Sequence, residues 1–237
     1  MPKLRVEDRD RGRWMVFDDE SDPPAGAGPR VVLVAGGSAP DEARLREVAA
    51  GADVLVCTDG GLRSAWAVGL VPALVVGDPK ALPDWARERL PPEAVVDDRG
   101  QDANDLEKAL GEIRQRWGEV AEVSILGAAS GGVRTDHTLA HLGVLLTEPH
   151  RRLQWIDRSG RMVALRSGKL FVEDAVGTTL SLLPWSLHGT VLSAVGVHYP
   201  LDEKRLLLGG RGIANQIGDD EASVEVHEGV ALVWIGV

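Results

Sequence analysis

The chain of 237 residues is long enough for one large domain or two small ones, and either can bury a sizeable core. Its formal net charge of −10, without a concentrated basic stripe, argues against a nucleic-acid or anionic-membrane partner. The apolar runs are too short to span a bilayer, the charged N-terminus lacks a signal-peptide core, and the single cysteine, Cys57, rules out an internal disulfide, so we expect a cytoplasmic protein.

The N-terminal part, residues 1–29, is a charged arm with one candidate strand at Trp14–Phe17, and it ends in the linker-like run SDPPAGAGP. From Arg30 onward, short β-branched runs alternate with segments of helical character. This alternation predicts an α/β domain over residues 30–150, in which a parallel sheet has flanking helices. The predicted strands are Val31–Val34, Val54–Cys57, Leu74–Val76, Ala94–Val96 and Val123–Leu126, and the predicted helices are Asp41–Ala50, Leu62–Val68, Asp84–Arg89, Asp105–Trp117 and Asp136–Leu146.

Beyond about residue 150 the helical segments stop, and closely spaced strands follow with turn signals such as Ser167-Gly and Glu228-Gly between them. This spacing predicts an all-β sandwich over residues 151–237 as the C-terminal domain. The predicted strands are Leu153–Ile156, Arg161–Leu165, Lys169–Val172, Thr179–Leu183, Thr190–Val197, Arg205–Leu208, Ala222–Val226 and Val230–Ile235.

The residues that follow the predicted parallel strands hold the candidate chemistry, because open α/β sheets bind ligands at the carboxyl ends of their strands. A glycine pair follows the first strand, and carboxylates follow the other four. Mg²⁺ is usually held by one or two carboxylates together with substrate phosphates, and an arginine supplies a planar donor fork for phosphate oxygens. The sequence therefore predicts a magnesium and polyphosphate site, built from Gly36, Gly37, Asp59, Asp78, Asp105, Arg134 and Asp136.

Each motif by itself has a plainer interpretation. Gly36-Gly37-Ser38 is neither a dinucleotide fingerprint nor a Walker A loop, so an NAD-binding α/β protein is a remote alternative. Asp59 and Asp105 can serve simply as helix N-caps. His137 and His141 share a helix face, but the glutamate of a zinc-protease HExxH motif is absent, which favours a structural role for His137.

The order and spacing of these motifs resemble the thiamine pyrophosphokinase (thiamine diphosphokinase) family. In the α/β half the similar stretches are DGG at 59–61, GD at 77–78, QDANDLEKAL at 101–110 and a GxRxDHTL stretch at 132–139. In the β half they are GTTLSLLPW at 177–185, GVHYPL at 196–201 and GGRGIANQI at 209–217. The resemblance extends from about Val31 to the C-terminus.

The resemblance implies a Mg²⁺-dependent transfer of diphosphate from ATP to thiamine, which gives thiamine diphosphate and AMP. It also implies a nucleotide-binding α/β domain, a thiamine-binding β-sandwich and a homodimer with active sites between subunits. By position, catalytic roles fall to Asp59, Asp78, Asp105, Arg134 and Asp136, with the metal bound by Asp59, Asp78 and Asp105. Nucleotide-binding roles fall to Gly36, Gly37, Gln101, Asn104, Arg134 and His137, and thiamine-binding roles fall to Tyr199, Ala214 and Asn215.

Three features depart from the family pattern. Lys80 stands where the GDFDS segment of the family has its second acid, Ala214 replaces the serine of a Ser-Asn pair, and the Gly-rich loop before Arg134 is one residue longer than the common form. Asn104 also stands where the family usually has threonine. These departures keep two alternatives open. One is a diphosphokinase of the same fold for another heterocyclic alcohol, and the other is a catalytically impaired homologue that binds nucleotide or thiamine diphosphate as a sensor.

Overall fold

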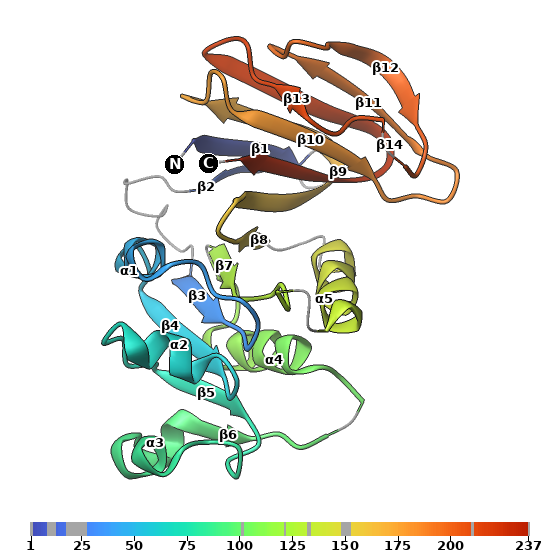
Figure 1. Cartoon of the computed structure of the whole chain (residues 1–237). Helices are drawn as coiled ribbons and strands as arrows, with labels where there is room; N and C mark the ends of the chain where they lie inside the picture. Colours follow the sequence, from blue (N-terminus) through green and yellow to red (C-terminus); the bar gives the residue numbers. More distant parts are fainter. Residues whose placement is uncertain are drawn as a thin grey trace. The chain divides into compact units, whose positions relative to one another are not determined.

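The structure, a computed structural model, describes residues 2–8, 13–17, 28–100, 102–120, 122–131, 134–147, 153–209 and 211–236. The chain divides into two compact units (Figure 1). An α/β unit contains the described residues from 28 to 147 together with 153–158, and a β unit contains the described residues from 2 to 17 together with 159–236. The units thus interleave along the chain, whereas the sequence suggested an arm and two consecutive domains.

The α/β unit is built on a parallel sheet, as the alternating pattern predicted. Within the described residues its strands lie in the order β8-β7-β3-β4-β5-β6, and every neighbouring pair is parallel. All five predicted strands are present, and the central strands β3, β5 and β7 are almost fully buried, as is usual in a parallel sheet covered on both faces. The bounds are Arg30–Val34 for β3, Val54–Thr58 for β4, Leu74–Gly77 for β5, Val95–Asp97 for β6, Glu122–Leu126 for β7 and Leu153–Ile156 for β8.

The helices of this unit follow the predicted segments closely, and the starts of α1 and α4 have side-chain caps. Asp41 caps α1 by accepting a hydrogen bond from the Arg44 amide, and Asn104 with Glu107 forms a capping box at the start of α4. The apolar face of α4 is buried and packs against β4 and β5. The bounds are Glu42–Ala50 for α1, Leu62–Ala67 for α2, Asp84–Arg89 for α3, Asp105–Trp117 for α4 and Thr135–Thr147 for α5, with a 3₁₀ turn at Pro92–Ala94.

Strand β8 was expected to open the β-sandwich, but it extends the α/β sheet instead. It pairs in parallel with β7, from Val123 opposite Leu153 to Leu126 opposite Ile156. All four residues of β8 are buried, as is usual for a strand covered on both faces of a parallel sheet. The sequence LQWI of Leu153–Ile156 predicts a strand, but it holds no information about which neighbour the strand pairs with.

The β unit is antiparallel and is organised by two long strands, β9 and β14. One half of β14 pairs with β11 and the other half pairs with β10, while β9 lies alongside both halves. Residues from β1, β9, β10, β11 and β14 share one apolar core. The bounds are Lys3–Asp8 for β1, Arg13–Phe17 for β2, Gly160–Glu173 for β9, Thr179–Pro184 for β10, Thr190–Val195 for β11, Leu201–Leu206 for β12, Asn215–Gln216 for β13 and Glu221–Gly236 for β14.

Two pairs of predicted strands are single strands in the structure. Arg161–Leu165 and Lys169–Val172 lie in β9, and Ala222–Val226 and Val230–Ile235 lie in β14. The register between β9 and β14 shifts between Val226 and Val230, and Ser167 and Gly229 have φ angles of 40° and 88°. Left-handed residues serve in bulges as well as in turns, so the two turn signals mark a bulge in this sheet.

The N-terminal arm contributes a strand to the β unit. Strand β1 pairs antiparallel with β9, from Lys3 opposite Glu173 to Asp8 opposite Gly168, and β2 pairs with β1. Leu4 and Val6 are buried in the core of this unit. None of the helices in the described part of the chain has the length and apolar character needed to cross a bilayer.

Candidate active site

The loops at the carboxyl ends of the parallel strands enclose a cavity of about 670 Å³ within the α/β unit. Because β7, β3, β4 and β5 are neighbours and parallel, the segments that leave them meet at one edge of the sheet. Among the residues proposed from the sequence, seven line this cavity: Gly36, Gly37, Asp59, Asn104, Asp105, Arg134 and His137. Gln101 lies outside the described residues, and Asp78 and Asp136 stand close by without lining the cavity.

The glycine pair after β3 is required by a close approach between loops. The amide of Gly37 donates to the carbonyl of Gly127 at 2.8 Å, and the amide of Ser38 donates to the carbonyl of Ala129 at 2.6 Å. A Cβ atom on Gly37 would lie 2.2 Å from the Ala129 oxygen, so only glycine fits. The Gly37 amide is already occupied, and hence it is not a free donor for a phosphate.

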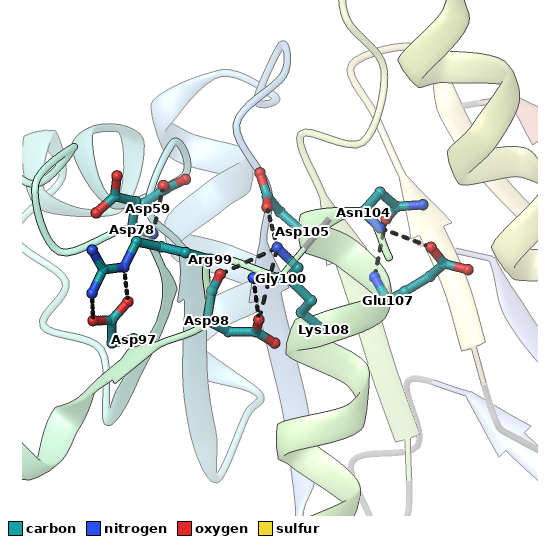
Figure 2. Close-up of polar contacts among 10 residues, drawn as sticks. All are labelled: Asp59, Asp78, Asp97, Asp98, Arg99, Gly100, Asn104, Asp105, Glu107 and Lys108. Carbon is teal, nitrogen blue, oxygen red and sulfur yellow. Dashed lines mark hydrogen bonds and ion pairs between the residues drawn. The ribbon is translucent and has the colours of Figure 1, made fainter. Parts of the chain in front are cut away.

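Asp59 and Asp78 form the acidic centre of the site (Figure 2). The amide of Gly60 donates to Asp59 Oδ1 at 2.6 Å, and the amide of Asp78 donates to Asp59 Oδ2 at 3.2 Å. Asp78 Oδ1 accepts from the Lys80 amide at 2.9 Å, so Lys80 supports this carboxylate through its backbone. These contacts orient the Asp59 carboxylate against the backbone of Asp78 and fix the Asp78 carboxylate at the end of the adjacent strand.

Asp105 stands apart from that pair, at the first residue of α4 (Figure 2). Its Oδ1 lies 3.7 Å from the Lys108 ammonium, one turn further along the same helix. Within the described residues, no three His, Cys, Asp or Glu side chains lie close enough to form a metal site. Metal binding by Asp59, Asp78 and Asp105 therefore stays a prediction, and the direct contact that the structure describes among these three residues is the hydrogen bond from the Asp78 amide to the Asp59 carboxylate. Two carboxylates suit Mg²⁺, which takes its remaining ligands from phosphates and water.

Arg134 and Asp136 pair with each other at the start of α5. The guanidinium donates to both carboxylate oxygens, from Nε to Oδ1 at 3.0 Å and from Nη2 to Oδ2 at 2.8 Å. This hydrogen-bonded pair holds the pKa of Asp136 well below its usual range and raises the pKa of Arg134. We expected Asp136 to join the acidic cluster and Arg134 to stand ready for phosphate, but in the structure each neutralises the other.

The loop between β7 and α5 is fixed by hydroxyl groups that the sequence analysis did not single out. Ser130 Oγ lies 2.9 Å from Thr138 Oγ1 and accepts from the Arg134 amide at 3.1 Å. His141 is buried, and its Nδ1 lies 2.8 Å from the Ala128 carbonyl oxygen. These contacts give His141 a structural role, while His137 remains exposed at the cavity wall.

The residues proposed to bind thiamine are neighbours in the β unit. Asn215 clamps the backbone of Tyr199: its Oδ1 accepts from the Tyr199 amide at 3.0 Å, and its Nδ2 donates to the Tyr199 carbonyl at 2.9 Å. The Tyr199 side chain is 72% exposed. Ala214 adopts a left-handed φ of 57°, and its amide donates to Ser181 Oγ at 3.0 Å. Asn215 therefore positions the loop, and Tyr199 presents its ring to solvent.

Comparison with known proteins shows that the chain is similar to a protein family in sequence and to solved structures in fold. Residues 45–156 match the family model described as thiamin pyrophosphokinase, catalytic domain. The structure is similar to thiamine pyrophosphokinase from Bacillus subtilis, with a TM-score of 0.74 at 20% identity over 88% of this chain and 99% of that chain.

Two further solved structures show the same fold. Thiamin pyrophosphokinase from Geobacillus thermodenitrificans has a TM-score of 0.76 at 22% identity, over 88% of this chain and 97% of that chain. Thiamin pyrophosphokinase from Candida albicans has a TM-score of 0.75 at 18% identity, over 88% of both chains. No curated protein sequence matches the chain significantly. The resemblance of this chain to the thiamine pyrophosphokinase family, inferred from its ordered motifs, is confirmed by the family model and by the fold.

Proposed function

We propose that this protein is a thiamine pyrophosphokinase that transfers the diphosphate of ATP to thiamine in a Mg²⁺-dependent reaction, giving thiamine diphosphate and AMP. The observation that supports it most is the cavity at the strand ends, which Asp59, Asn104, Asp105 and Arg134 line, with the Asp78 amide bonded to the Asp59 carboxylate close by. Polar groups from loops and helix starts line a space that is large enough for a nucleotide.

In this proposal Asp59 and Asp78 hold the magnesium ion, since both carboxylates are already oriented by backbone amides. When bound, Mg²⁺ supplies charge stabilisation to the phosphate oxygens. Arg134 exchanges part of its pairing with Asp136 for a phosphate oxygen, which requires only a side-chain movement because both groups are solvent-exposed.

The chemical step joins the thiamine hydroxyl oxygen to the β-phosphorus of ATP and breaks the bond from that phosphorus to the bridging oxygen of AMP. Transfers of this kind depend mainly on positioning and electrostatics. The hydroxyl proton passes to a carboxylate or to water, and Asp105 at the cavity wall is the candidate acceptor. We place the thiamine contact of the β unit at Tyr199 and propose a homodimer in which such contacts complete each site.

The test is direct product analysis. Purified protein is incubated with ATP, Mg²⁺ and thiamine, and thiamine diphosphate and AMP are quantified by chromatography. An Asp105→Ala variant should lose turnover. An Asp84→Ala variant, which removes an acid at the start of α3 that does not line the cavity, should keep it. Equimolar formation of both products would establish the reaction.

Other outcomes separate the remaining alternatives. AMP release with a different acceptor from a panel of heterocyclic alcohols would assign a diphosphokinase of altered specificity. Tight binding of ATP or thiamine diphosphate with no product from any acceptor would refute the kinase assignment and favour a sensor.

A further inference from the structure

Lys108 is a buried cation at the cavity wall that none of the roles above uses. It lies in the first turn of α4, its side chain is 7% exposed, and it lines the cavity. Its ammonium donates one hydrogen bond, to the Asp98 carbonyl oxygen at 3.2 Å. Two carboxylate oxygens, Asp105 Oδ1 at 3.7 Å and Asp98 Oδ1 at 3.9 Å, lie within ion-pair distance but beyond hydrogen-bond distance (Figure 2).

An ammonium group has three donors, so this geometry leaves donor capacity that the described residues do not use. Arg134 also lines the cavity, and its guanidinium is committed to Asp136 by two hydrogen bonds. Arg134 keeps further N–H donors but is largely exposed to water, so of the lysine and arginine residues described at the cavity wall Lys108 is the buried one.

The location of this lysine is electrostatically unfavourable unless it has a partner. The N-terminal turn of a helix bears partial positive charge and favours anions, and burial removes water from the ammonium. Asp98 and Asp105 offset part of this cost only through long ion pairs. An anionic oxygen in the cavity would complete the coordination and share the positive helix terminus.

Lys108 also connects the parts of the site. The Asp98 carboxylate accepts from the Gly100 amide at 3.0 Å, and the Asp98 amide donates to the Gly77 carbonyl at 3.2 Å. Gly77 precedes Asp78, so one run of contacts joins the magnesium carboxylates to the start of α4. An anion bound at Lys108 would lie between Asp105 and that pair.

We propose that Lys108 binds an oxygen of the polyphosphate of the nucleotide and thereby sets the position of the phosphates relative to Asp105. The identity of the ligand as ATP rests on the proposed function. The contact with an anionic oxygen rests on the buried ammonium itself. The interaction is a charge-assisted hydrogen bond, and it does not require the metal ion.

The test compares binding of ATP and of adenosine to the full-length chain by isothermal titration calorimetry, with and without Mg²⁺. Lys108→Gln keeps an N–H donor for the Asp98 carbonyl but removes the charge, Lys108→Arg keeps the charge, and Lys204→Gln on β12 is the matched control outside the cavity. We expect Lys108→Gln to weaken ATP binding about tenfold or more, with and without Mg²⁺, and to leave adenosine binding unchanged. Lys108→Arg should restore ATP affinity to within about threefold, and Lys204→Gln should match the wild type.

Two results would overturn this inference. One is an ATP affinity of Lys108→Gln equal to that of the wild type, and the other is an equal loss of affinity for ATP and for adenosine, which would indicate that Lys108 has a purely structural role. Circular dichroism of each variant confirms that it is folded, and Lys108→Arg supplies the readout if the glutamine variant is not. Product analysis keeps the two proposals separate. If Lys108→Gln weakens ATP binding but the wild-type protein makes no thiamine diphosphate, the proposed kinase activity is refuted and the phosphate contact is supported.

Discussion

Replacing Gly77 by alanine tests whether the position of the Asp59 carboxylate depends on a glycine at the end of β5. Gly77 is the last residue of β5 and has a φ of 148°, where residues with a side chain are rarely found. A Cβ atom built on it would lie 2.7 Å from Asp59 Cγ and Oδ2 and 2.9 Å from Asp59 Cβ. Because real Cβ contacts are essentially never that short, the Asp59 side chain has to move away from the Asp78 amide.

The expected cost follows from three contributions. The backbone strain amounts to about 1–3 kcal/mol. The lost hydrogen bond to the charged acceptor adds about 1.5–3 kcal/mol, with the lower end suited to a half-buried carboxylate that water can reach. The lower entropy of the unfolded alanine chain offsets about 0.4–1 kcal/mol. We therefore expect Gly77→Ala to reduce the free energy of unfolding by about 2–4 kcal/mol.

Urea denaturation followed by the fluorescence of the seven tryptophans measures this change, and product analysis measures turnover. The matched control is Gly111→Ala inside α4, where an added Cβ meets no heavy atom within 4 Å. That variant should gain about 0.5–1 kcal/mol from helix propensity. If Gly77→Ala kept the unfolding free energy of the wild type and full turnover, the inferred dependence of the Asp59 carboxylate on this glycine would be refuted.

Three further predictions concern the local environment of single groups. Because Arg134 lowers the pKa of Asp136, this carboxyl should stay ionised in carboxyl NMR titrations as the pH falls through about 3.9. The contribution of the pair to stability is therefore present above that pH and lost only below it. Arg134→Gln should return the titration midpoint of Asp136 to about 3.9. Burial raises the pKa of the Cys57 thiol, so a thiol reagent at about pH 8 should label it only in denaturant. Asn104→Ala removes the capping box of α4 and should lower the free energy of unfolding by about 0.5–2 kcal/mol in urea titrations.

The elements that could be predicted from the sequence are those with a local signal. The helix over Asp105–Trp117 was predicted with its observed bounds, and the structure shows that Asn104 rather than Asp105 is its N-cap, in a capping box with Glu107. The strands of the parallel sheet were found from their short β-branched runs, which suit strands buried on both faces. In both cases the information lies within a few neighbouring residues.

What the sequence did not reveal is which distant partners pair. Leu153–Ile156 has the same strand-like sequence whether it joins β7 or an antiparallel neighbour. Ser167 and Gly229 signal left-handed backbone without indicating whether the chain turns back or only bulges. Pairing depends on the geometry of the whole sheet, so these errors arise from non-local contacts.

The candidate site divides in the same way. The strand-end rule placed Asp59 beside Asp78, because parallel neighbours end at one edge of the sheet. It gave no information on how side chains share their charges. Arg134 and Asp136 are two residues apart and pair with each other, and Lys108 approaches Asp105 at a spacing of three residues along α4. The latter spacing was visible in the sequence and would have indicated Lys108.

The pairing of β1 with β9 has a consequence for the order in which the protein is assembled. The register from Asp8 opposite Gly168 to Lys3 opposite Glu173 separates partners by 160 to 170 positions along the chain. On a ribosome that adds about 5–20 residues per second, β1 waits roughly ten seconds or more for β9 to be made. During that interval Leu4 and Val6 have no core to enter, so the β unit closes late in synthesis, after the parallel strands of the α/β unit have emerged.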